Sequence, residues 1–442
     1  MDARVDPFPV LSDAGRAMLA FLREHPSAPI FRNQSGHKLT AAEIAAARAA
    51  EAEVLEARVS WSAQPAWLPD FIARTWREVP FFRRQGAAPA RLEDVAPTSR
   101  ADLARDVAAF VPDPLAIDRL IQYATSGTTG HPLLVPSHPA VAASYLAYHK
   151  RALARVGVEL AHGAGQVGVV LLGYQTRCFT YVSVTPTMGE SGLVKLNLHP
   201  ADWRDPADRG RYLEALAAEV ISGDPISFAE LLALDCDLSP RALLSTAMAL
   251  APGLTQTLAA RFRCPVLDLY SMNEAGPIAV RDQRAGGHVL LQPRLLVEIL
   301  GPDGARLAPG ERGEVTLTGG FNPYLPLLRY RTGDHAALDI AGDQLVLVDL
   351  AGRRPVRFRA ADGSWKNNVD VSHALAPHAA AQTALHQAAD GSFLLRARGG
   401  QLEALRGSLV ALFGAGARIE VAELADEDKV LQYTSDLPDA EP

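Results

Sequence analysis

The sequence predicts a mixed α/β protein: a large N-terminal layered α/β domain that contains a β-rich subdomain, and a small α+β C-terminal domain joined by a hinge. Residues 165–173 form a short apolar run bounded by glycines, and residues 265–270 form a second apolar run. Such runs are typical of strands buried on both faces. A helical segment expected over about 240–262 precedes the second run. Helices that alternate with buried strands indicate a parallel, layered core.

Helices are expected first along the chain, and short strands after residue 285. Residues 11–58 are alanine-rich with helical apolar spacing, and another amphipathic helix is expected over 65–78, ending before Pro80. The strands of the β-rich subdomain are expected at 294–300, at 313–318 and on both sides of Gly342-Asp343.

The C-terminal part has the pattern of a separate small unit. We expect a strand at 393–398, a helix at 401–413 ended by Gly414, and a strand at 418–424. We therefore predict two domains, residues 1–352 as the core and residues 353–442 as a small mobile domain.

The composition excludes several classes of protein. The chain has 442 residues, 48% of them hydrophobic and 21% charged, with a formal net charge of -7. This mild acidity offers no basic surface to nucleic acid or to an anionic membrane. No apolar run reaches the roughly 18 residues of a transmembrane helix. An acidic start without the basic region of a signal peptide, and three widely spaced cysteines, predict a cytoplasmic protein.

A cluster of glycines and hydroxyl residues is the first candidate binding site. It consists of Thr125, Ser126, Gly127, Thr128, Thr129 and Gly130, between a β-like stretch and a helix expected from about Pro139. Because glycine permits unusual backbone angles, such a loop can wrap N–H groups and hydroxyls around phosphate oxygens. No Gly-Lys-Ser/Thr follows, which excludes a Walker loop. By itself, such a cluster is more often a surface turn.

Together with three later segments, this loop resembles the motifs of the adenylate-forming enzymes, the superfamily of acyl- and aryl-CoA synthetases. Residues 125–130 resemble its phosphate loop, and Gly352-Arg353 resembles the start of its hinge motif. Tyr270-Ser271-Met272-Asn273-Glu274 resembles its Tyr-Gly-x-Thr-Glu motif, and Tyr330-Arg331-Thr332-Gly333-Asp334 its Tyr-x-Thr-Gly-Asp motif. The runs 79–83 and 326–331 look most like the phenylacetate–CoA ligase branch.

The resemblance implies a role for each matching residue. The implied catalytic residues are Glu274, Arg353 and Lys429, with Glu274 as the ligand of Mg²⁺. Glu274 follows a predicted parallel strand, where open α/β sheets form their ligand crevice. The implied ATP and AMP contacts are the whole 125–130 loop, Ser245, Ala247, Tyr270, Ser271, Asn273, Asp334 and Arg353. The implied walls of the substrate pocket are Tyr174, Phe228, Met272 and Gly276.

The activity implied by the resemblance is an AMP-forming acid–thiol ligase. It would use ATP and Mg²⁺ to convert a carboxylic acid, expected to be an aryl acid, to an acyl-adenylate, and would pass the acyl group to coenzyme A. Two alternatives stay open. One is transfer to an acyl carrier protein or an amine, and the other is a non-catalytic descendant that binds a nucleotide or an acyl ligand.

Two departures from the family pattern bear on the transfer of the acyl group to coenzyme A. The family's hinge reads Gly-Arg-x-Asp-Asp, whereas this chain has Gly352-Arg353-Arg354-Pro355-Val356, with a proline that fixes its own φ. The region 357–370, where the family has its CoA loop, is also longer and more polar.

Overall fold

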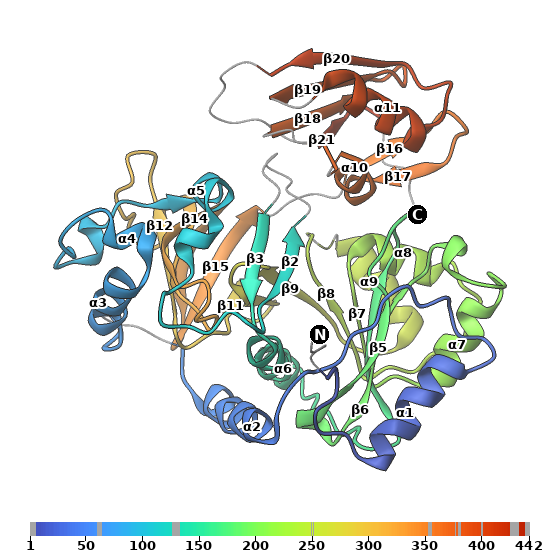
Figure 1. The fold of residues 1–442 in the computed structure, drawn as a ribbon, viewed down its shortest axis with the longest axis horizontal. Helices are drawn as coiled ribbons and strands as arrows, with labels where there is room; N and C mark the ends of the chain where they lie inside the picture. Colours follow the sequence, from blue (N-terminus) through green and yellow to red (C-terminus); the bar gives the residue numbers. More distant parts are fainter. Residues whose placement is uncertain are drawn as a thin grey trace.

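A computed structural model shows the chain as a large domain with a smaller domain beside it (Figure 1). The structure describes residues 6–59, 64–125, 133–248, 250, 252–351, 356–375, 377–378, 382–398, 401–424 and 433–437. The architecture is the predicted one: a large N-terminal α/β domain and a small α+β C-terminal domain.

One half of the main sheet is parallel and forms the layered core. Its parallel strands are β4 (Val167–Gly173), β6 (Ser191–Asn197), β7 (Val220–Gly223), β8 (Ala242–Ser245) and β9 (Val266–Met272). They lie in the order β9-β8-β7-β4-β6. The strand β5 (Tyr181–Thr185) pairs antiparallel with β6 at the edge of the sheet. Both apolar runs are strands as predicted, β4 and β9; most of β4 is buried, whereas every second residue of β9 is only half-buried.

The helix expected over 240–262 is wrong in its first part. Residues 242–245 are the fully buried strand β8, and the helix α9 covers only Pro252–Phe262. Leu243 packs in the cluster with α8 and α9, and Leu244 packs in the opposite cluster with α6. A short apolar run covered on both faces carries no periodicity that separates a strand from a helix.

The other half of the sheet is antiparallel and contains the predicted β-rich region. It comprises β10 (Gly276–Asp282), β11 (Gly287–Leu290), β12 (Leu295–Leu300), β13 (Arg312–Gly319), β14 (Leu327–Ala341) and β15 (Gln344–Ala351). The order β12-β13-β14-β15-β11-β10-β9 continues directly into the parallel half. The β-rich region is therefore hydrogen-bonded to the core sheet through β9.

Helices cover both faces of the parallel half, as Figure 1 shows. The helices of the large domain are α1 (Asp13–Glu24), α2 (Ala41–Glu56), α3 (Leu68–Glu78), α4 (Pro80–Arg83), α5 (Arg100–Arg105), α6 (Pro139–Ala154), α7 (Asp208–Leu216), α8 (Pro225–Leu232) and α9. Short 3-10 turns lie at Leu92–Asp94, Val107–Phe110, Pro186–Met188 and Pro200–Asp202. The α3 helix ends before Pro80 as predicted, because proline cannot donate the next helical hydrogen bond.

The helical pattern expected over 11–58 is two helices. The second, α2, begins at a capping box in which Thr40 and Glu43 bind each other's backbone N–H groups. Two further short strands, β2 (Ile121–Thr125) and β3 (Leu133–Ser137), form an antiparallel pair on either side of the glycine-rich loop.

The small domain has its own sheet and its own core. Its elements are β16 (Arg357–Arg359), β17 (Trp365–Asn367), α10 (Asn368–Leu375), β18 (Gln382–Gln387), β19 (Phe393–Arg398), α11 (Leu402–Phe413), β20 (Ile419–Glu423) and β21 (Tyr433–Ser435). The strand, helix and strand predicted here are β19, α11 and β20, and Phe358, Phe393 and Phe413 meet in the core. The predicted boundary after residue 352 and the hinge 352–355 lie outside the described residues.

Among the helices that the structure describes, none is long and apolar enough to cross a membrane.

Candidate active site

Glu274 lies in the turn between β9 and β10, inside the molecule. Its side chain is 2% exposed, and its Oε1 accepts hydrogen bonds from Nη1 of Arg100 at 2.7 Å and from the hydroxyl of Tyr330 at 3.1 Å. An unpaired carboxylate in such a place would cost several kcal/mol, so the guanidinium is what makes this burial possible. Glu274 is therefore not a solvated loop residue.

Arg100 and Tyr330 reach Glu274 because a two-residue strand holds their segments together. The strand β1 (Thr98–Ser99) pairs in parallel with β14, with Thr98 opposite Tyr330. Arg100 then begins α5, whose start is fixed by a capping box between Ser99 and Asp102. Arg100 was not among the predicted site residues, because a capping box predicts where a helix begins but not which side chain its first residue contacts.

The second and third family motifs meet at Asp334. The hydroxyl of Tyr270, on β9, donates to Oδ2 of Asp334 at 2.8 Å, and the backbone N–H of Asp334 donates to Thr332 Oγ1 at 3.1 Å. Gly333 has φ 82, a left-handed conformation that favours glycine, and its N–H donates to a carboxylate oxygen of Glu314 at 2.9 Å. The stretch of β14 that presents Asp334 is therefore fixed by Tyr270 from β9 and by Glu314 from β13.

Ser245, Ala247 and Asn273 were predicted as nucleotide contacts. Ser245 ends β8 and is fully buried, and its hydroxyl has no hydrogen-bond partner within the described part of the chain. Ala247 is exposed in the loop that follows, with φ 71, and Asn273 is exposed in the β9–β10 turn. The three lie at the carboxyl ends of adjacent parallel strands, the place where α/β sheets bind ligands.

Aromatic rings surround the predicted pocket residue Gly276. Gly276 has φ 68, and a Cβ there would lie 2.3 Å from Cε1 of Phe321 and 3.4 Å from Cε1 of Tyr145. The rings of Phe321 and Tyr145 meet edge to face at 5.1 Å. Burial raises the pKa of Tyr145, and the nearby Tyr123 and the charge of Glu274 raise it further. Tyr145 and Phe321, which the sequence analysis missed, therefore border the Glu274 site.

The remaining predicted pocket residues have different environments. Met272 is half-buried against the cluster that contains β14, and Ser271 beside it is also half-buried. Phe228, on α8, is fully buried in the core cluster under the parallel strands, so its observed role is packing. Tyr174 follows β4 and is half-buried, with its ring 5.7 Å from that of His199.

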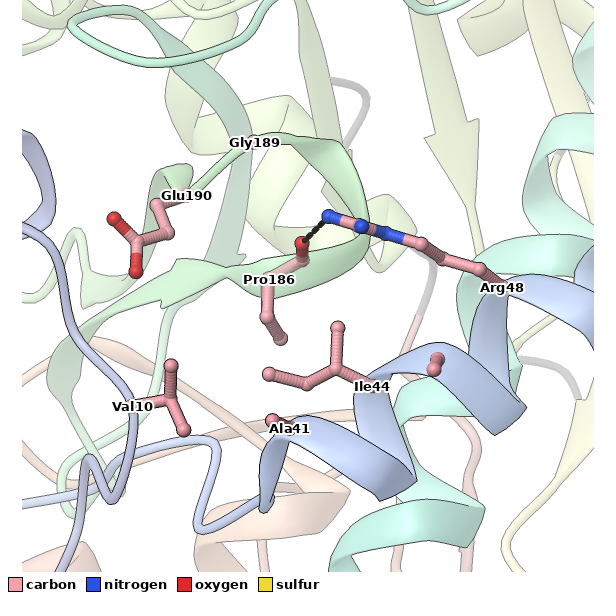
Figure 2. Close-up of a pocket in the computed structure, with 8 residues that line it drawn as sticks. Val10, Ala41, Ile44, Arg48, Pro186, Gly189 and Glu190 are labelled. Atoms are coloured by element: carbon pink, nitrogen blue, oxygen red, sulfur yellow. Dashed lines mark hydrogen bonds between the residues drawn. The ribbon is translucent and has the colours of Figure 1, made fainter.

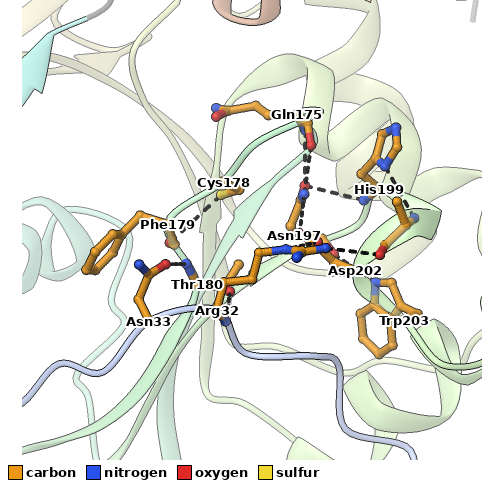
Figure 3. Close-up of polar contacts among 11 residues, drawn as sticks. Arg32, Asn33, Gln175, Cys178, Phe179, Thr180, Asn197, His199, Asp202 and Trp203 are labelled. Carbon is orange, nitrogen blue, oxygen red and sulfur yellow. Dashed lines mark hydrogen bonds and ion pairs between the residues drawn. The ribbon is translucent and has the colours of Figure 1, made fainter. Parts of the chain in front are cut away.

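A buried asparagine holds the loop that carries Tyr174, as Figure 3 shows. The side chain of Asn197, at the end of β6, accepts from the N–H of Gln175 at 3.0 Å and donates to the Gln175 carbonyl at 2.7 Å. It also donates to Asp202, which is paired with Arg32 at 2.6 Å. The only sequence signal for this role was a polar residue at the end of an apolar strand.

The small domain contacts the large one at this same loop. The backbone N–H of Thr176 donates to Oδ1 of Asp370, at the start of α10, at 2.6 Å. Asp370 is itself buried, so the loop after β4 lies against the small domain.

Several predicted site residues cannot be placed. Those outside the described residues are Ser126, Gly127, Thr128, Thr129, Gly130, Arg353 and Lys429. Of Thr125 only the backbone, at the end of β2, is described.

A separate surface groove of about 390 Å³ lies between α2 and the β5–β6 connection, with Val10, Ile44, Arg48 and Glu190 in its wall (Figure 2). None of the predicted site residues lines it.

The comparisons with known proteins identify the family. Residues 94–322 match the AMP-binding enzyme family, more than half of the chain, and the protein belongs to this family of adenylate-forming enzymes. No curated protein matches the chain. The fold is similar to 2-hydroxyisobutyryl-CoA ligase in complex with 2-HIB-AMP and CoA in the thioesterification state, with 18% identity, a TM-score of 0.54, and coverage of 90% of this chain and 91% of that one.

A second structure of that ligase is similar to the same degree. In the postadenylation state with 2-HIB-AMP it has 16% identity and a TM-score of 0.52, covering 84% of this chain and 88% of that one. At these identities the likeness concerns the fold.

Among the described residues, Glu274 is the carboxylate that the resemblance assigns to Mg²⁺. Among the described residues no group of three or more His, Cys, Asp or Glu could hold a metal. Oε1 of Glu274 is already bonded to Arg100 and Tyr330. The described residues of the site therefore do not fit a resident Mg²⁺; with these ligands the ion would have to come with ATP, as part of the substrate.

Proposed function

We propose that the protein is an AMP-forming acid–thiol ligase, which activates a carboxylic acid as its acyl-adenylate and transfers the acyl group to coenzyme A. The observation that carries the proposal is the meeting of two family motifs: Tyr270 with Asp334, and Tyr330 with Glu274. The similar 2-hydroxyisobutyryl-CoA ligase binds 2-HIB-AMP and CoA. Membership of the AMP-binding enzymes supports the same chemistry.

In the first half-reaction the acid's carboxylate would attack the α-phosphorus of ATP and release pyrophosphate. Asp334 is proposed to accept hydrogen bonds from the ribose hydroxyls, with Tyr270 orienting it, since a carboxylate can accept two such bonds. Ser245, Ala247, Ser271, Asn273 and the 125–130 loop are proposed to hold the rest of the nucleotide. Catalysis then consists of positioning and of charge neutralisation at the phosphates.

We propose an aryl acid, of the kind used by phenylacetate–CoA ligases, as the substrate. The rings of Tyr145 and Phe321 beside Gly276, with Met272 close by in sequence, support a flat pocket. Phe321 occupies the space that any side chain at residue 276 would need, so the wall there is aromatic rather than aliphatic. Tyr174, beside the small domain, is proposed to face the entrance.

In the second half-reaction a thiol would displace AMP after the small domain has turned. Lys429 is proposed to neutralise the developing charge during adenylation, and Arg353 to contact ribose and phosphate. Replacing Lys429 by Ala should then slow acyl-adenylate formation by at least about a hundredfold and leave thiol transfer from supplied acyl-adenylate much less affected. We expect both steps to take place in the cytoplasm, where free cysteines such as Cys178 stay reduced.

The first test is pyrophosphate release from ATP and Mg²⁺ with a panel of aryl and aliphatic acids. We expect benzoates or phenylacetates to give the highest kcat/KM. No release with any acid would favour the non-catalytic alternative, and calorimetry with ATP then shows whether that protein binds a nucleotide. Mass spectrometry of the products with coenzyme A, a phosphopantetheinyl carrier protein and simple amines then identifies the acceptor.

A further inference from the structure

The pair of Arg100 and Glu274 is a feature that the family motifs do not contain. The guanidinium side chain is 11% exposed and the carboxylate 2%, and Nη1 lies 2.7 Å from Oε1. Both hydrogen bonds that the described residues make to this carboxylate end on Oε1. The pair therefore joins the first residue of α5 to a motif glutamate 174 positions further along the chain.

A divalent cation bound by Glu274 would lie close to the guanidinium of Arg100, because both bind the same carboxylate. Two positive charges within about 4 Å of each other repel by several kcal/mol at the dielectric of a protein surface, before any other group compensates. A bound triphosphate supplies that compensation, because its charge attracts both cations. Without nucleotide, the cation that neutralises Glu274 is the one the protein carries itself.

We propose that Arg100 is a positioning residue that holds Glu274 in place of a metal ion until nucleotide arrives, so that the site binds divalent cation only together with ATP. This inference rests on the proposed function, since it assigns Glu274 to the metal that ATP brings. It also explains why Glu274 suffices although the described residues offer no metal-binding group of three or more side chains: the remaining oxygens come from the substrate. The protein thereby avoids filling its nucleotide site with a bare metal ion.

The test is metal binding without nucleotide. Mn²⁺ is titrated into the wild-type protein and four variants: Arg100→Met, Arg100→Gln, Arg100→Lys and the double variant Arg100→Met/Glu274→Gln. Mn²⁺ prefers the same oxygen ligands as Mg²⁺, and its binding is measured by electron paramagnetic resonance. We expect the neutral variants to bind Mn²⁺ at least about tenfold more tightly than wild type, since a repelling charge has been removed. Arg100→Lys, which keeps the charge, should behave like wild type, and the double variant should lose the gain.

The matched control is Arg119→Met. Glu43 lies on α2, outside the site, and is paired with Arg119 at the same distance, 2.7 Å. The change removes the arginine partner of a glutamate that is 24% exposed, and it should not create tight Mn²⁺ binding. Thermal unfolding with and without Mn²⁺ confirms that each variant is folded and provides a second measure of binding.

Three results would overturn the proposal. The first is a folded Arg100→Met or Arg100→Gln that binds Mn²⁺ no better than wild type. The second is a gain that survives Glu274→Gln. The third is a wild-type protein that binds Mn²⁺ as tightly without nucleotide as with it, which needs no variant to fold. Failure of the proposed function is seen separately, as wild-type protein that releases no pyrophosphate from ATP with any acid of the panel.

Discussion

Two buried arginine–glutamate pairs lie in the antiparallel half of the molecule, and they are built differently. In the first, Arg100 donates directly to Glu274 and Tyr330 adds a second donor. In the second, Nε of Arg329 lies 3.7 Å from Oε2 of Glu298, too far for a hydrogen bond. The two glutamates are equally buried, so burial by itself does not separate a site residue from a structural one.

The two arginines have different hydrogen-bond partners. Arg329 donates to the backbone carbonyl oxygens of Glu93, Val95 and Gly304 at 3.1, 2.9 and 3.0 Å, and it has φ 45, a conformation that costs energy for a residue other than glycine. It ties loops to β14. Neither carboxylate oxygen of Glu298 has a hydrogen-bond partner in the described part of the chain, and burial raises the pKa of Glu298. The carboxylate at Glu274, in contrast, is held at a defined place by side chains from two other segments.

The largest expected effect is a difference in pyrophosphate release between variants of the two glutamates. Glu274→Gln should lower pyrophosphate release by at least about a hundredfold, because a group that acts on the reacting phosphates is lost. Glu298→Gln, the matched control, should leave the rate within about twofold of wild type, because a surface or core change outside a site has little effect on the chemistry. Equal losses in the two variants, measured at saturating ATP and Mg²⁺, would break the comparison.

A second change tests whether Asp334 belongs with Glu274. Asp334→Asn should raise the KM for ATP by about tenfold with a smaller change in kcat, because ribose contacts are made in the ground state and the transition state alike. The same variant should bind AMP more weakly in calorimetry. If the dependence of the rate on ATP is unchanged, Asp334 is a structural residue of β14 that only bonds with Thr332 and Tyr270.

A smaller effect is expected for Tyr330→Phe. The variant removes one of the two donors to Glu274 and keeps the buried ring, so we expect a loss of about 1 kcal/mol of positioning, or roughly fivefold in kcat/KM. The stability of the fold, measured by urea unfolding, should change by less than that of a ring deletion such as Tyr330→Ala. A rate equal to wild type would mean that Arg100 alone positions the carboxylate.

The smallest effect concerns stability and pH. Because the folded protein raises the pKa of Glu298 above its ordinary value of 4.5, it holds the proton more tightly than the unfolded chain does. Wild-type stability therefore falls as pH rises through this window, and Glu298→Gln, which is neutral throughout, lacks that fall. From about pH 4 to pH 7, the free energy of unfolding of the variant should therefore rise relative to that of wild type. If the difference in the free energy of unfolding between Glu298→Gln and wild type does not change with pH, Arg329 stabilises the charged form of Glu298.

Local patterns in the sequence predicted most of the fold. The runs at 165–173 and 265–270 became β4 and β9, the turn at Gly342-Asp343 joins β14 to β15, and the strand–helix–strand pattern after 393 was found in the small domain. These predictions rest on side-chain periodicity and turn chemistry, which act over a few residues. The prediction failed at β8, where every residue is buried and no periodicity is left to read.

By itself the sequence determined which motif residues are available and the order in which they occur: Tyr270, Glu274, Tyr330 and Asp334. Only the tertiary structure decided their partners. Arg100 reaches Glu274 because β1 pairs with β14, and Tyr270 reaches Asp334 although other strands of the sheet lie between β9 and β14. Contacts between residues so far apart in the chain depend on strand order and register, which are set by the packing of the whole sheet, whereas propensity and capping depend on neighbours alone.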